Sequence, residues 1–480
     1  RRVPGDPVPI LATASPGLLA LSAMNRLLTG RDYDQTDGGE DSEDVDVEDA
    51  EGAEGDSDME QPSDDEDEEN DDEEASDEGN LSNPLMFRNV MLRRSGSLPH
   101  LARALSETFG SIVRSVEKCH PKADDHIETP LHYLQRRASS LFAIVDGACC
   151  LSRKNRTILC EEHGCSGTLI SNILRLITAV PLQLETSSVV ISDVALSALR
   201  ALTSLSHENP TAAEQMLPPQ GIGWQKSIIR KRKNGKLQLA SSGQFVQLDR
   251  ASGLSGIAII VHKLHEMALA QQQVRKAKSA GNPQVDDSLE KHCYDVVIFC
   301  LNTLTNVVEM ASFTGARQKI ANLKLEVDGK KISALSWVAS WLTDQTTSYR
   351  DAMMTGSFGE GDSARGNSFT PEEANEHRDL EKHEEEYLVT AGNGFILLAC
   401  LMKPIEEGPN VDEDTSKIRQ TILSEMPMDA RGRRIGVTLI IKTLKAFCNF
   451  YHYSIGDLSV AIVAPVLKLI RGLESIHIPE

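Results

Sequence analysis

The chain has few aromatic residues, which make up 4% of its 480 residues, while hydrophobic residues make up 40%. This composition disfavours an all-β protein and is typical of helices that pack through Leu, Ala and Val. The nine cysteines are scattered and odd in number, so we expect buried free thiols in a reducing compartment. The longest apolar run, GFILLACLM, is much too short to cross a bilayer. The chain begins with Arg1 rather than Met, so we expect an internal or processed piece.

Sequence motifs of the common enzyme classes are missing. The sequence has no nucleophile elbow, P-loop, Rossmann glycine pattern or zincin helix. The segment CEEHGC supplies Cys160, His163 and Cys165, but no second Cys/His pair follows at the spacing of a zinc site. We therefore interpret that segment as a turn after a helix. We predict a non-enzymatic protein with no catalytic, metal-binding or cofactor-binding residues and no cofactor.

Lys and Arg are absent from one long stretch. Residues 32–80 contain 27 Asp/Glu and no Lys/Arg, so the net charge of −22 comes from this stretch and the rest of the chain carries a net charge of +5. Such a run repels itself and cannot bury enough apolar surface to offset its chain entropy. We predict a disordered acidic tail over residues 1–85. It acts either as a solubilising tail, as a docking segment for a basic partner such as a histone, or as a competitor for a basic groove.

Apolar residues recur at helical spacing over most of the remaining chain. The blocks lie at residues 101–118, 130–152, 167–180, 188–206, 255–275, 291–311, 333–343, 385–403, 415–426, 435–453 and 457–476. We therefore predict an all-α fold. The exception is LKLEVDGKKI (Leu323–Ile332), which alternates with a period of two and contains Asp328–Gly329, a hairpin signal.

Two helical blocks resemble each other in sequence. ALRALTSLSHENP (Ala198–Pro210) aligns with CLNTLTNVVEMA (Cys300–Ala311), and CLSRKNR (Cys150–Arg156) aligns with SLSHENP at an offset of 54 residues. A helix, a polar turn with Asn and another helix are typical of HEAT and armadillo repeats, whose period is about 40–47 residues. We predict an α-solenoid of this type with long loop insertions. In it, Asn302 and Asn306 bond the backbone ends of adjacent helices, or form a partner-binding ridge.

Two inserts divide the predicted solenoid. The first, residues 218–255 within a larger helical block over 86–343, contains KSIIRKRKNGK, a basic loop suited to binding phosphate or to serving as a nuclear-import signal. The second, residues 344–384, is rich in Gly, Ser and Thr and then charged, which predicts a flexible linker. A smaller helical block follows over residues 385–480.

The segment RRSGSLP (Arg93–Pro99) resembles a ligand of 14-3-3 proteins. Arg94, Ser95, Ser97 and Pro99 match the Arg-Ser-x-phosphoSer-x-Pro pattern. A phosphate on Ser97 supplies charge and acceptor oxygens for an arginine cluster. The segment is thus either a phosphosite at Ser97 that binds 14-3-3, or an unmodified flexible hinge.

The C-terminal helices occur in an order that is similar to one family. EEEYLVTAGNGFILLACLMK (Glu384–Lys403) precedes TSKIRQTILSEMP (Thr415–Pro427), and GVTLIIKTLKAFCNFYHYS (Gly436–Ser454) follows. Together with LTNVVEMA, this order resembles the C-terminal domain of the wings-apart-like (WAPL) family of cohesin-release proteins. The resemblance covers about residue 100 to the end. The Phe-Gly-Phe-type motifs by which animal members engage a HEAT-repeat cohesin partner are absent, and only Phe109–Gly110 is present.

The resemblance implies a HEAT-like scaffold, located in the nucleus on chromatin, that binds the cohesin ring and promotes its release. Its partners would be the SMC-type ATPase, the kleisin and the HEAT-repeat regulators of cohesin; no membrane contact is expected, and direct DNA contact is left open. Side chains that lie off the apolar stripes are the candidate partner-binding residues: Asn306, Glu309, Lys417, Arg419, Lys442 and Lys445. Two alternatives are a general armadillo/HEAT-type interaction adaptor and an enzyme whose site has no known motif.

Overall fold

The structure is a computed structural model of the whole chain. It describes residues 84–118, 130–149, 152–161, 167–179, 189–225, 244–249, 252–279, 287–310, 315–327, 329–356, 371–403, 411–428 and 435–474. The predicted acidic tail, apart from its last two residues, and the basic residues of KSIIRKRKNGK lie outside this part of the chain.

The described residues are mostly helical and contain little sheet, as the apolar periodicity predicts. Each predicted apolar block corresponds to a helix of the structure. The helices are α4 (Pro84–Arg94), α5 (Ser97–Lys118), α6 (Pro130–Cys149), α7 (Arg153–Cys160), α8 (Leu169–Ala179), α9 (Val189–Ser206), α10 (Pro210–Gln215), α11 (Gly256–Ser279), α12 (Asp287–Met310), α13 (Gly315–Asn322), α14 (Ala334–Gly356), α15 (Pro371–Met402), α16 (Val411–Ser424), α17 (Gly436–Ile455) and α18 (Val460–Glu474), with a 3-10 turn, η2 (Gly456–Ser459), between the last two.

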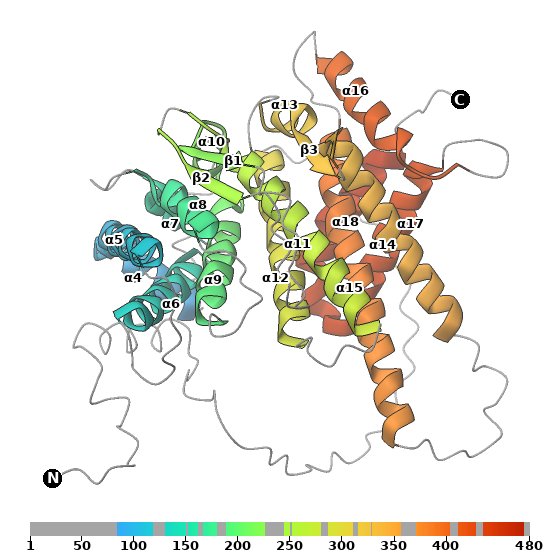
Figure 1. Cartoon of the computed structure of the whole chain (residues 1–480), viewed down its shortest axis with the longest axis horizontal. Helices are drawn as coiled ribbons and strands as arrows, with labels where there is room; N and C mark the ends of the chain where they lie inside the picture. The colour runs from blue at the N-terminus through green and yellow to red at the C-terminus, as the bar shows by residue number, and fades with distance from the viewer. Residues whose placement is uncertain are drawn as a thin grey trace, which may run out of the picture.

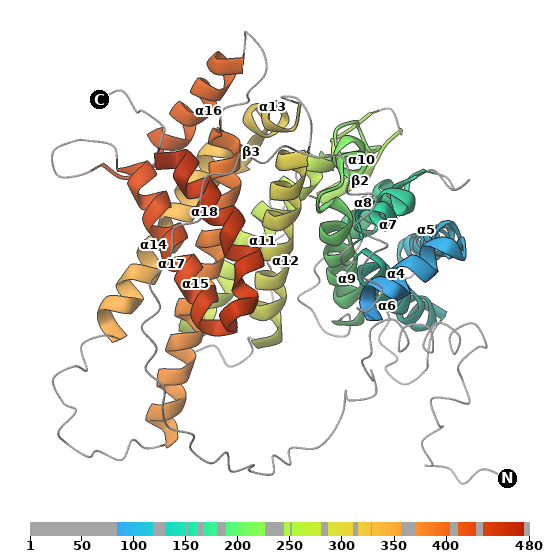
Figure 2. The same cartoon turned by 180° about the vertical axis from the view of Figure 1, so that it is seen from behind.

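The helices are stacked in two rows that follow the order of the chain (Figure 1). The first row consists of α6, α9, α12, α15 and α17, and each of these helices contacts the next one. In the second row α5 contacts α8, α8 contacts α11, α13 bridges α11 and α14, and α14 contacts α16. Across the rows α5 packs on α6, α8 on α9, α11 on α12 and α14 on α15. Figure 2 shows the first row from behind, with α18 covering α17.

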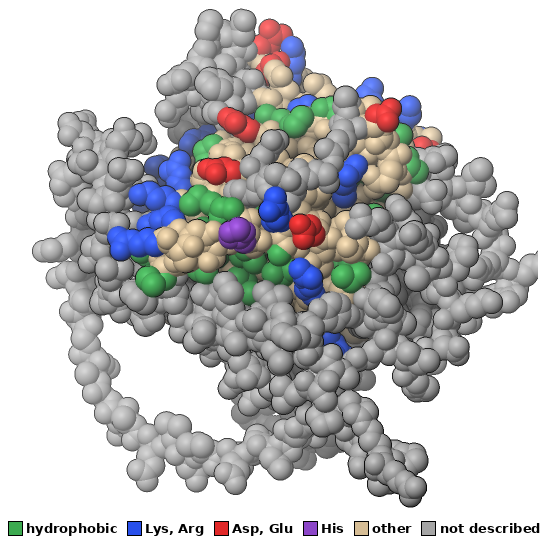
Figure 3. All heavy atoms as spheres, turned by 90° about the vertical axis from the view of Figure 1, so that its left-hand side faces the viewer, with side chains coloured by type: hydrophobic (Ala, Val, Ile, Leu, Met, Phe, Trp, Pro, Cys, Tyr) green, Lys and Arg blue, Asp and Glu red, His purple; other side chains and the backbone are tan. Residues whose placement is uncertain are grey.

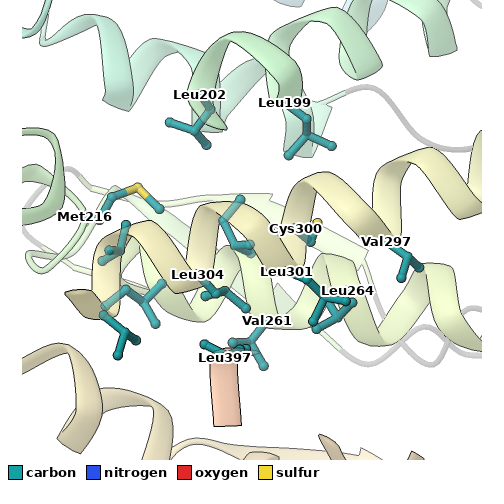
Figure 4. Packing of buried hydrophobic residues seen from close by; sticks show 14 of the residues in the cluster. Leu199, Leu202, Met216, Val261, Leu264, Val297, Cys300, Leu301, Leu304 and Leu397 are labelled. Carbon is teal, nitrogen blue, oxygen red and sulfur yellow. The ribbon is translucent and has the colours of Figure 1, made fainter. Parts of the chain in front are cut away.

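Helix α12 lies at the centre of the stack and contacts α9, α11 and α15. Figure 4 shows its side chains Val297, Cys300, Leu301 and Leu304, all buried, between Leu199 of α9 and the neighbouring helices. Within the described residues, Ser288–Met310 of this helix is the one segment long and apolar enough to span a membrane by length and composition. Its position among three packed helices accounts for that composition, because a helix covered on several sides is apolar on several sides.

The two stretches that match in sequence are neighbours in the first row. Ala198–Pro210 covers the end of α9 and Cys300–Ala311 the end of α12, and these helices pack on each other. The hydroxyls of Thr203 and Thr303 lie 2.9 Å apart across this contact. Thr203 aligns with Thr305, so the contact joins it to a neighbour of its counterpart; the similar stretches lie in consecutive helices of the same row.

Two small antiparallel hairpins interrupt the helices. Strands β3 (Lys324–Val327) and β4 (Lys330–Ser333) pair with Val327 opposite Lys330, which confirms the hairpin expected at Asp328–Gly329. Gly329 has a φ of +79°, a conformation that a turn of this kind requires and that glycine adopts without strain. Strands β1 (Ile222–Gln225) and β2 (Gln244–Gln247) join the two ends of the predicted basic insert.

The β1–β2 hairpin packs on α11 through aromatic rings. The indole of Trp224 stacks on the imidazole of His262 with ring centres 4.6 Å apart, and Phe245 meets Trp224 edge to face. Burial lowers the pKa of His262 to about 4, and burial lowers that of His265 to about 4 as well. Both imidazoles are therefore neutral at physiological pH, which suits the contact of His262 with the hairpin and of His265 with the ring of Trp337 on α14.

The predicted linker over residues 344–384 is partly helical. Helix α14 continues to Gly356 and α15 begins at Pro371, leaving 357–370 outside the described residues. The sequence at the start of α15 favours a helix, with Pro at the first helical position and Glu372 and Glu373 in the first turn. The Glu, Ala and Lys that follow have high helix propensity. Because α15 contacts both α12 and α14, the two predicted helical blocks pack as one stack.

An ion network joins α11, α12 and α15. Arg275 bonds Glu290 at 2.8 Å and Glu386 at 2.9 Å, and its guanidinium lies 4.4 Å from the ring centre of Tyr387. Lys278 adds a second bond to Glu290 at 2.6 Å. These bonds fix the relative positions of three helices from both rows.

Candidate partner-binding surface

Asn306 joins the two central helices of the first row. Its amide donates from Nδ2 to the carbonyl oxygen of Thr203 at 3.1 Å and to the hydroxyl of Ser206 at 3.3 Å. Both acceptors lie in the last turn of α9, where the carbonyl oxygen of Thr203 also accepts from the backbone N–H of His207 at 3.2 Å and from the Ser206 hydroxyl at 3.0 Å. The amide of Asn306 therefore bonds the end of an adjacent helix, which is one of the two roles expected for this residue.

Two further asparagines make the same kind of bond. The amide of Asn155 donates to the carbonyl oxygen of Ala148 at 3.0 Å, near the end of α6. The amide of Asn209 donates to the carbonyl oxygen of Leu205 at 2.9 Å, near the end of α9. Asn155 and Asn209 are 54 residues apart and are equivalent in the sequence alignment. The repeated polar turn therefore satisfies helix ends inside the stack.

Glu309 lies three residues beyond Asn306 and reaches a different neighbour. Its Oε1 accepts a hydrogen bond from the thiol of Cys400 on α15 at 3.4 Å. Burial raises the pKa of Cys400 well above its ordinary value, and the charge of Glu309 raises it further. The sulfur therefore stays a thiol and a donor, while the rest of the exposed Glu309 side chain faces solvent.

Two guanidinium groups bind the carboxyl end of α15. Arg419 of α16 donates from Nε to the carbonyl oxygen of Met402 at 2.7 Å, and Arg317 of α13 donates to that of Lys403 at 2.6 Å. Cations are favourable at a helix carboxyl end, where partial negative charge collects. Burial lowers the pKa of Arg317, and the nearby charge of Arg419 acts in the same direction. With Glu309 and Cys400, these residues form what we call the α15 junction.

The three candidate lysines lie on the outer surface of α16 and α17. Lys417 is exposed and bonds Glu413 one turn away at 2.8 Å. Lys445 bonds Glu474 at 3.0 Å and so links α17 to α18, while Lys442 is exposed on α17. The structure thus brings Glu309 and Arg419 together at the α15 junction and spreads the lysines over the C-terminal end of the stack.

Several large apolar side chains are exposed on α17 and α18. We call this set the C-terminal apolar surface; its members are Tyr453, 86% exposed, Val460, 64% exposed, and Ile455, Ile462 and Leu467, each about 40% exposed. The residues come from the end of α17 and from α18. Exposed apolar side chains on two packed helices make this end of the stack a candidate for contact with another protein. The sequence pattern did not single them out, because an apolar stripe on a helix predicts burial.

Ser97 is placed at the first residue of α5, and its hydroxyl lies 2.6 Å from that of Ser95. The segment between α4 and α5 is a tight turn in which Gly96 has a φ of +66°. Leu98 is 1% exposed. A linear phosphopeptide ligand has to leave this helix, so 14-3-3 binding at Ser97 remains a prediction that requires the first turn of α5 to open.

Among the described residues, no group of three or more His, Cys, Asp and Glu side chains is placed to hold a metal ion. Cys160 of the CEEHGC segment is buried at the end of α7, and burial raises its pKa to about 12. His163 and Cys165 lie outside the described residues.

No protein-family model matches the chain, and no curated protein matches it.

Proposed function

We propose that the chain is a HEAT/armadillo-like scaffold, related to the WAPL family, that binds the cohesin ring and promotes its release from chromatin. The observation that carries this proposal is the two-row stack, in which consecutive helices of each row contact one another directly or, for α11 and α14, through α13. In repeat scaffolds of this type each unit packs on its neighbours and leaves long flanks for binding other proteins.

Part of the region that resembles the WAPL family forms the C-terminal end of the stack, and another part, LTNVVEMA, lies in α12 at its centre. Helices α15, α16 and α17 contain the three stretches on which the resemblance rests. The α15 junction, the three lysines and the C-terminal apolar surface all lie on these helices or beside them. A surface that offers both exposed apolar side chains and charged side chains suits a protein partner.

Such a scaffold can release DNA from a ring without chemistry of its own. A protein that binds the open state of a gate more tightly than the closed state shifts the equilibrium towards opening. The shift is limited by the difference between the two affinities, so the scaffold has to contact surfaces that differ between the states. A stack that touches the SMC-type ATPase and the kleisin at the same time meets this requirement, and it would act in the nucleus.

The test is a pull-down of cohesin subunits from nuclear extract by the full chain. We expect enrichment of the SMC-type ATPase, the kleisin and the HEAT-repeat regulators over an unrelated armadillo protein of similar size. The variant Tyr453→Ala with Val460→Ser and Leu467→Ser should lose most of this enrichment, because these side chains are exposed and contribute little to folding.

A matched control variant carries Met91→Ser with Leu248→Ser, two exposed apolar residues in other parts of the stack. It should keep the enrichment. Equal recovery of cohesin by the chain and by the unrelated armadillo protein would instead favour the general adaptor and end the specific proposal.

A further inference from the structure

Exposed apolar side chains are concentrated at the C-terminal end of the stack. Among the described residues eight large apolar side chains are exposed, and five of them belong to the C-terminal apolar surface. Figure 3 looks onto the opposite end, where Lys and Arg side chains lie among hydrophobic ones. Of the described side chains of α4 to α7, Met91 is the one large apolar residue that is exposed. The exposure is therefore a feature of α17 and α18.

Three apolar residues of α18 form a stripe along the helix. Val460, Val463 and Leu467 recur at i, i+3 and i+7, a spacing that places side chains on one side of a helix. Val460 and Leu467 are exposed, and Val463 is half-buried. The adjoining side carries the buried residues Val466 and Ile470, and α18 packs on α15 and α17 (Figure 2). The stripe thus extends the apolar surface of α18 past the side that the stack covers.

A stack of helices needs a polar outer side at its ends. Terminal units of repeat scaffolds carry such a side because it keeps the stack soluble. Helix α18 is the last helix that the structure describes, and its Val460 is 64% exposed. A further apolar segment that packs on the stripe would remove this surface from water.

Positive charge lies beside the stripe. Arg471 follows Leu467 by one helical turn, and Lys468 lies farther round on the same flank. Both are exposed, and neither forms an ion pair within the part of the chain that the structure describes. The acid at the end of the helix, Glu474, bonds Lys445 of α17 at 3.0 Å. A segment with negative charge next to its apolar residues therefore complements this side of α18.

The chain contains a segment with this combination, outside the described residues. Residues 17–28, GLLALSAMNRLL, contain no acid, and the acidic run over residues 32–80 begins four residues after them. Leu21, Met24 and Leu28 recur at i, i+3 and i+7, the spacing of the stripe on α18 and of helices that bind through one apolar side. Asp32 follows Leu28 by four residues, just as the exposed arginine of α18 follows the last residue of the stripe.

The length of chain between this segment and the stack suits such a contact. Residues 33–83 connect the start of the acidic run to α4. A flexible chain of this length spans about 40 Å on average, and repulsion among its carboxylates extends it. Packed helices lie about 8–10 Å apart, so the steps from α6 to α17 cover roughly 32–40 Å. A tether whose average length matches the span gives a high effective concentration, on the order of millimolar.

We propose that residues 17–28 dock as an amphipathic helix on the stripe of α18 in their own chain, parallel to α18. Leu21 then lies beside Val460 and Leu28 beside Leu467, and the start of the acidic run reaches the exposed arginine of α18. The docking itself does not depend on cohesin. Its consequence rests on the proposed function: the segment and cohesin compete for the C-terminal apolar surface.

Photo-cross-linking of the purified full chain tests the docking without cohesin. A benzophenone amino acid replaces Leu467 in one variant and Val460 in a second, and exposed Leu248 in a control. We expect the probe at Leu467 to join residues around Leu28 and the probe at Val460 to join residues around Leu21. The control should join this segment several times less often.

A mixture of isotopically light and heavy chains separates links within one chain from links between two copies. The proposal predicts links within one chain. Links that form mainly between light and heavy chains would assign the stripe to a second copy and overturn the proposal. A reversed order of the two contacts, or equal yields from the control probe, would overturn it as well.

Substitutions in the segment separate a specific contact from general apolar collapse. Leu21→Ser with Leu28→Ser removes two residues of the docking side, whereas Leu19→Ser with Leu27→Ser removes two leucines that lie off that side. We expect the first pair to lower the cross-link yield from Leu467 several-fold and the second pair to leave it nearly unchanged. Equal losses would refute the assigned side, and circular dichroism establishes that both variants fold.

Recovery of cohesin distinguishes this inference from the proposed function. In the pull-down, Leu21→Ser with Leu28→Ser should recover several-fold more cohesin subunits than the unmodified chain, because the competing segment no longer docks. Cross-links from Leu467 to the segment in a chain that binds no cohesin would support the docking and refute the proposed function. Cohesin binding by a chain without these cross-links would refute the docking alone.

Discussion

Asn306→Ala should lower the free energy of unfolding of this chain. The substitution removes one amide that reaches from α12 to α9 and bonds the carbonyl oxygen of Thr203 and the hydroxyl of Ser206. It leaves the apolar stripe of α12 unchanged, because Asn306 lies on a different side of the helix from Val307 and Val308.

The size of this loss in unfolding free energy depends on the hydrogen bonds that the substitution removes. A net hydrogen bond contributes about 0.5–1.5 kcal/mol, and Asn306 makes two. The carbonyl of Thr203 still accepts from Ser206 at 3.0 Å after the change, which limits the cost. Ala gains up to about 0.7 kcal/mol of helix propensity over Asn. We expect a net loss of about 1 kcal/mol.

Asn302→Ala is the matched control. Asn302 lies one turn earlier on the same helix and makes no side-chain hydrogen bond within the described part of the chain. Its replacement gains the same propensity without losing a bond, so the two variants should differ by about 1–2 kcal/mol. The midpoint of urea unfolding, followed by circular dichroism, measures this difference. Equal midpoints for the two variants would refute the role assigned to Asn306.

Two further predictions concern packing and pH. Gly392→Ala should destabilise the fold by about 1–3 kcal/mol, because a Cβ there would overlap the buried ring of Phe447. Gly472 faces open space, so Gly472→Ala should stabilise the fold by up to about 1 kcal/mol through helix propensity. Similar urea midpoints for the two variants would contradict this prediction. The free energy of unfolding should fall as pH drops from about 6.5 to about 4. Burial lowers the pKa of His262 and of His265 to about 4, so in this range the unfolded chain binds more protons than the folded chain. The expected loss of stability is about 3 kcal/mol per histidine. His262→Phe keeps the ring stack and should reduce this slope; an unchanged slope would contradict the assignment.

The long helices could be predicted from the sequence because each carries an apolar stripe over several turns. Helices α4, α7, α10 and α13 were missed, and α4 carries no clear apolar stripe. Helices α7, α10 and α13 have eight, six and eight residues, too few for a periodic pattern to stand out. Packing within the stack stabilises them, as for α7, whose Leu159 is fully buried. The charged start of α15 was interpreted as a linker since it has no apolar stripe.

The β1–β2 hairpin could not be predicted from local sequence. Its strands have four residues each and lie on either side of the long basic segment. Trp224 and Phe245 become neighbours only because both pack on His262 of α11. A pairing that depends on a third element leaves no periodic signal in either strand.

The candidate surface could be predicted only in part. The sequence singled out Glu309 and Arg419 as polar residues off the apolar stripes, and the structure brings them to one junction. Neither Arg317 nor the thiol of Cys400 had a signal in the sequence, because one lies in a helix too short to detect and the other is buried in an apolar stripe. The bond from Arg317 to the carbonyl of Lys403 joins residues 86 positions apart.

Cross-linking of the purified full chain to a reconstituted cohesin complex tests the proposed function most directly. If the chain is a cohesin-release scaffold, Lys417, Lys442 and Lys445 should form cross-links to the SMC-type ATPase or the kleisin, and substitutions in the C-terminal apolar surface should abolish them. A chain that shows no complex with cohesin, or one whose cross-links avoid α15 to α18 altogether, would contradict the account.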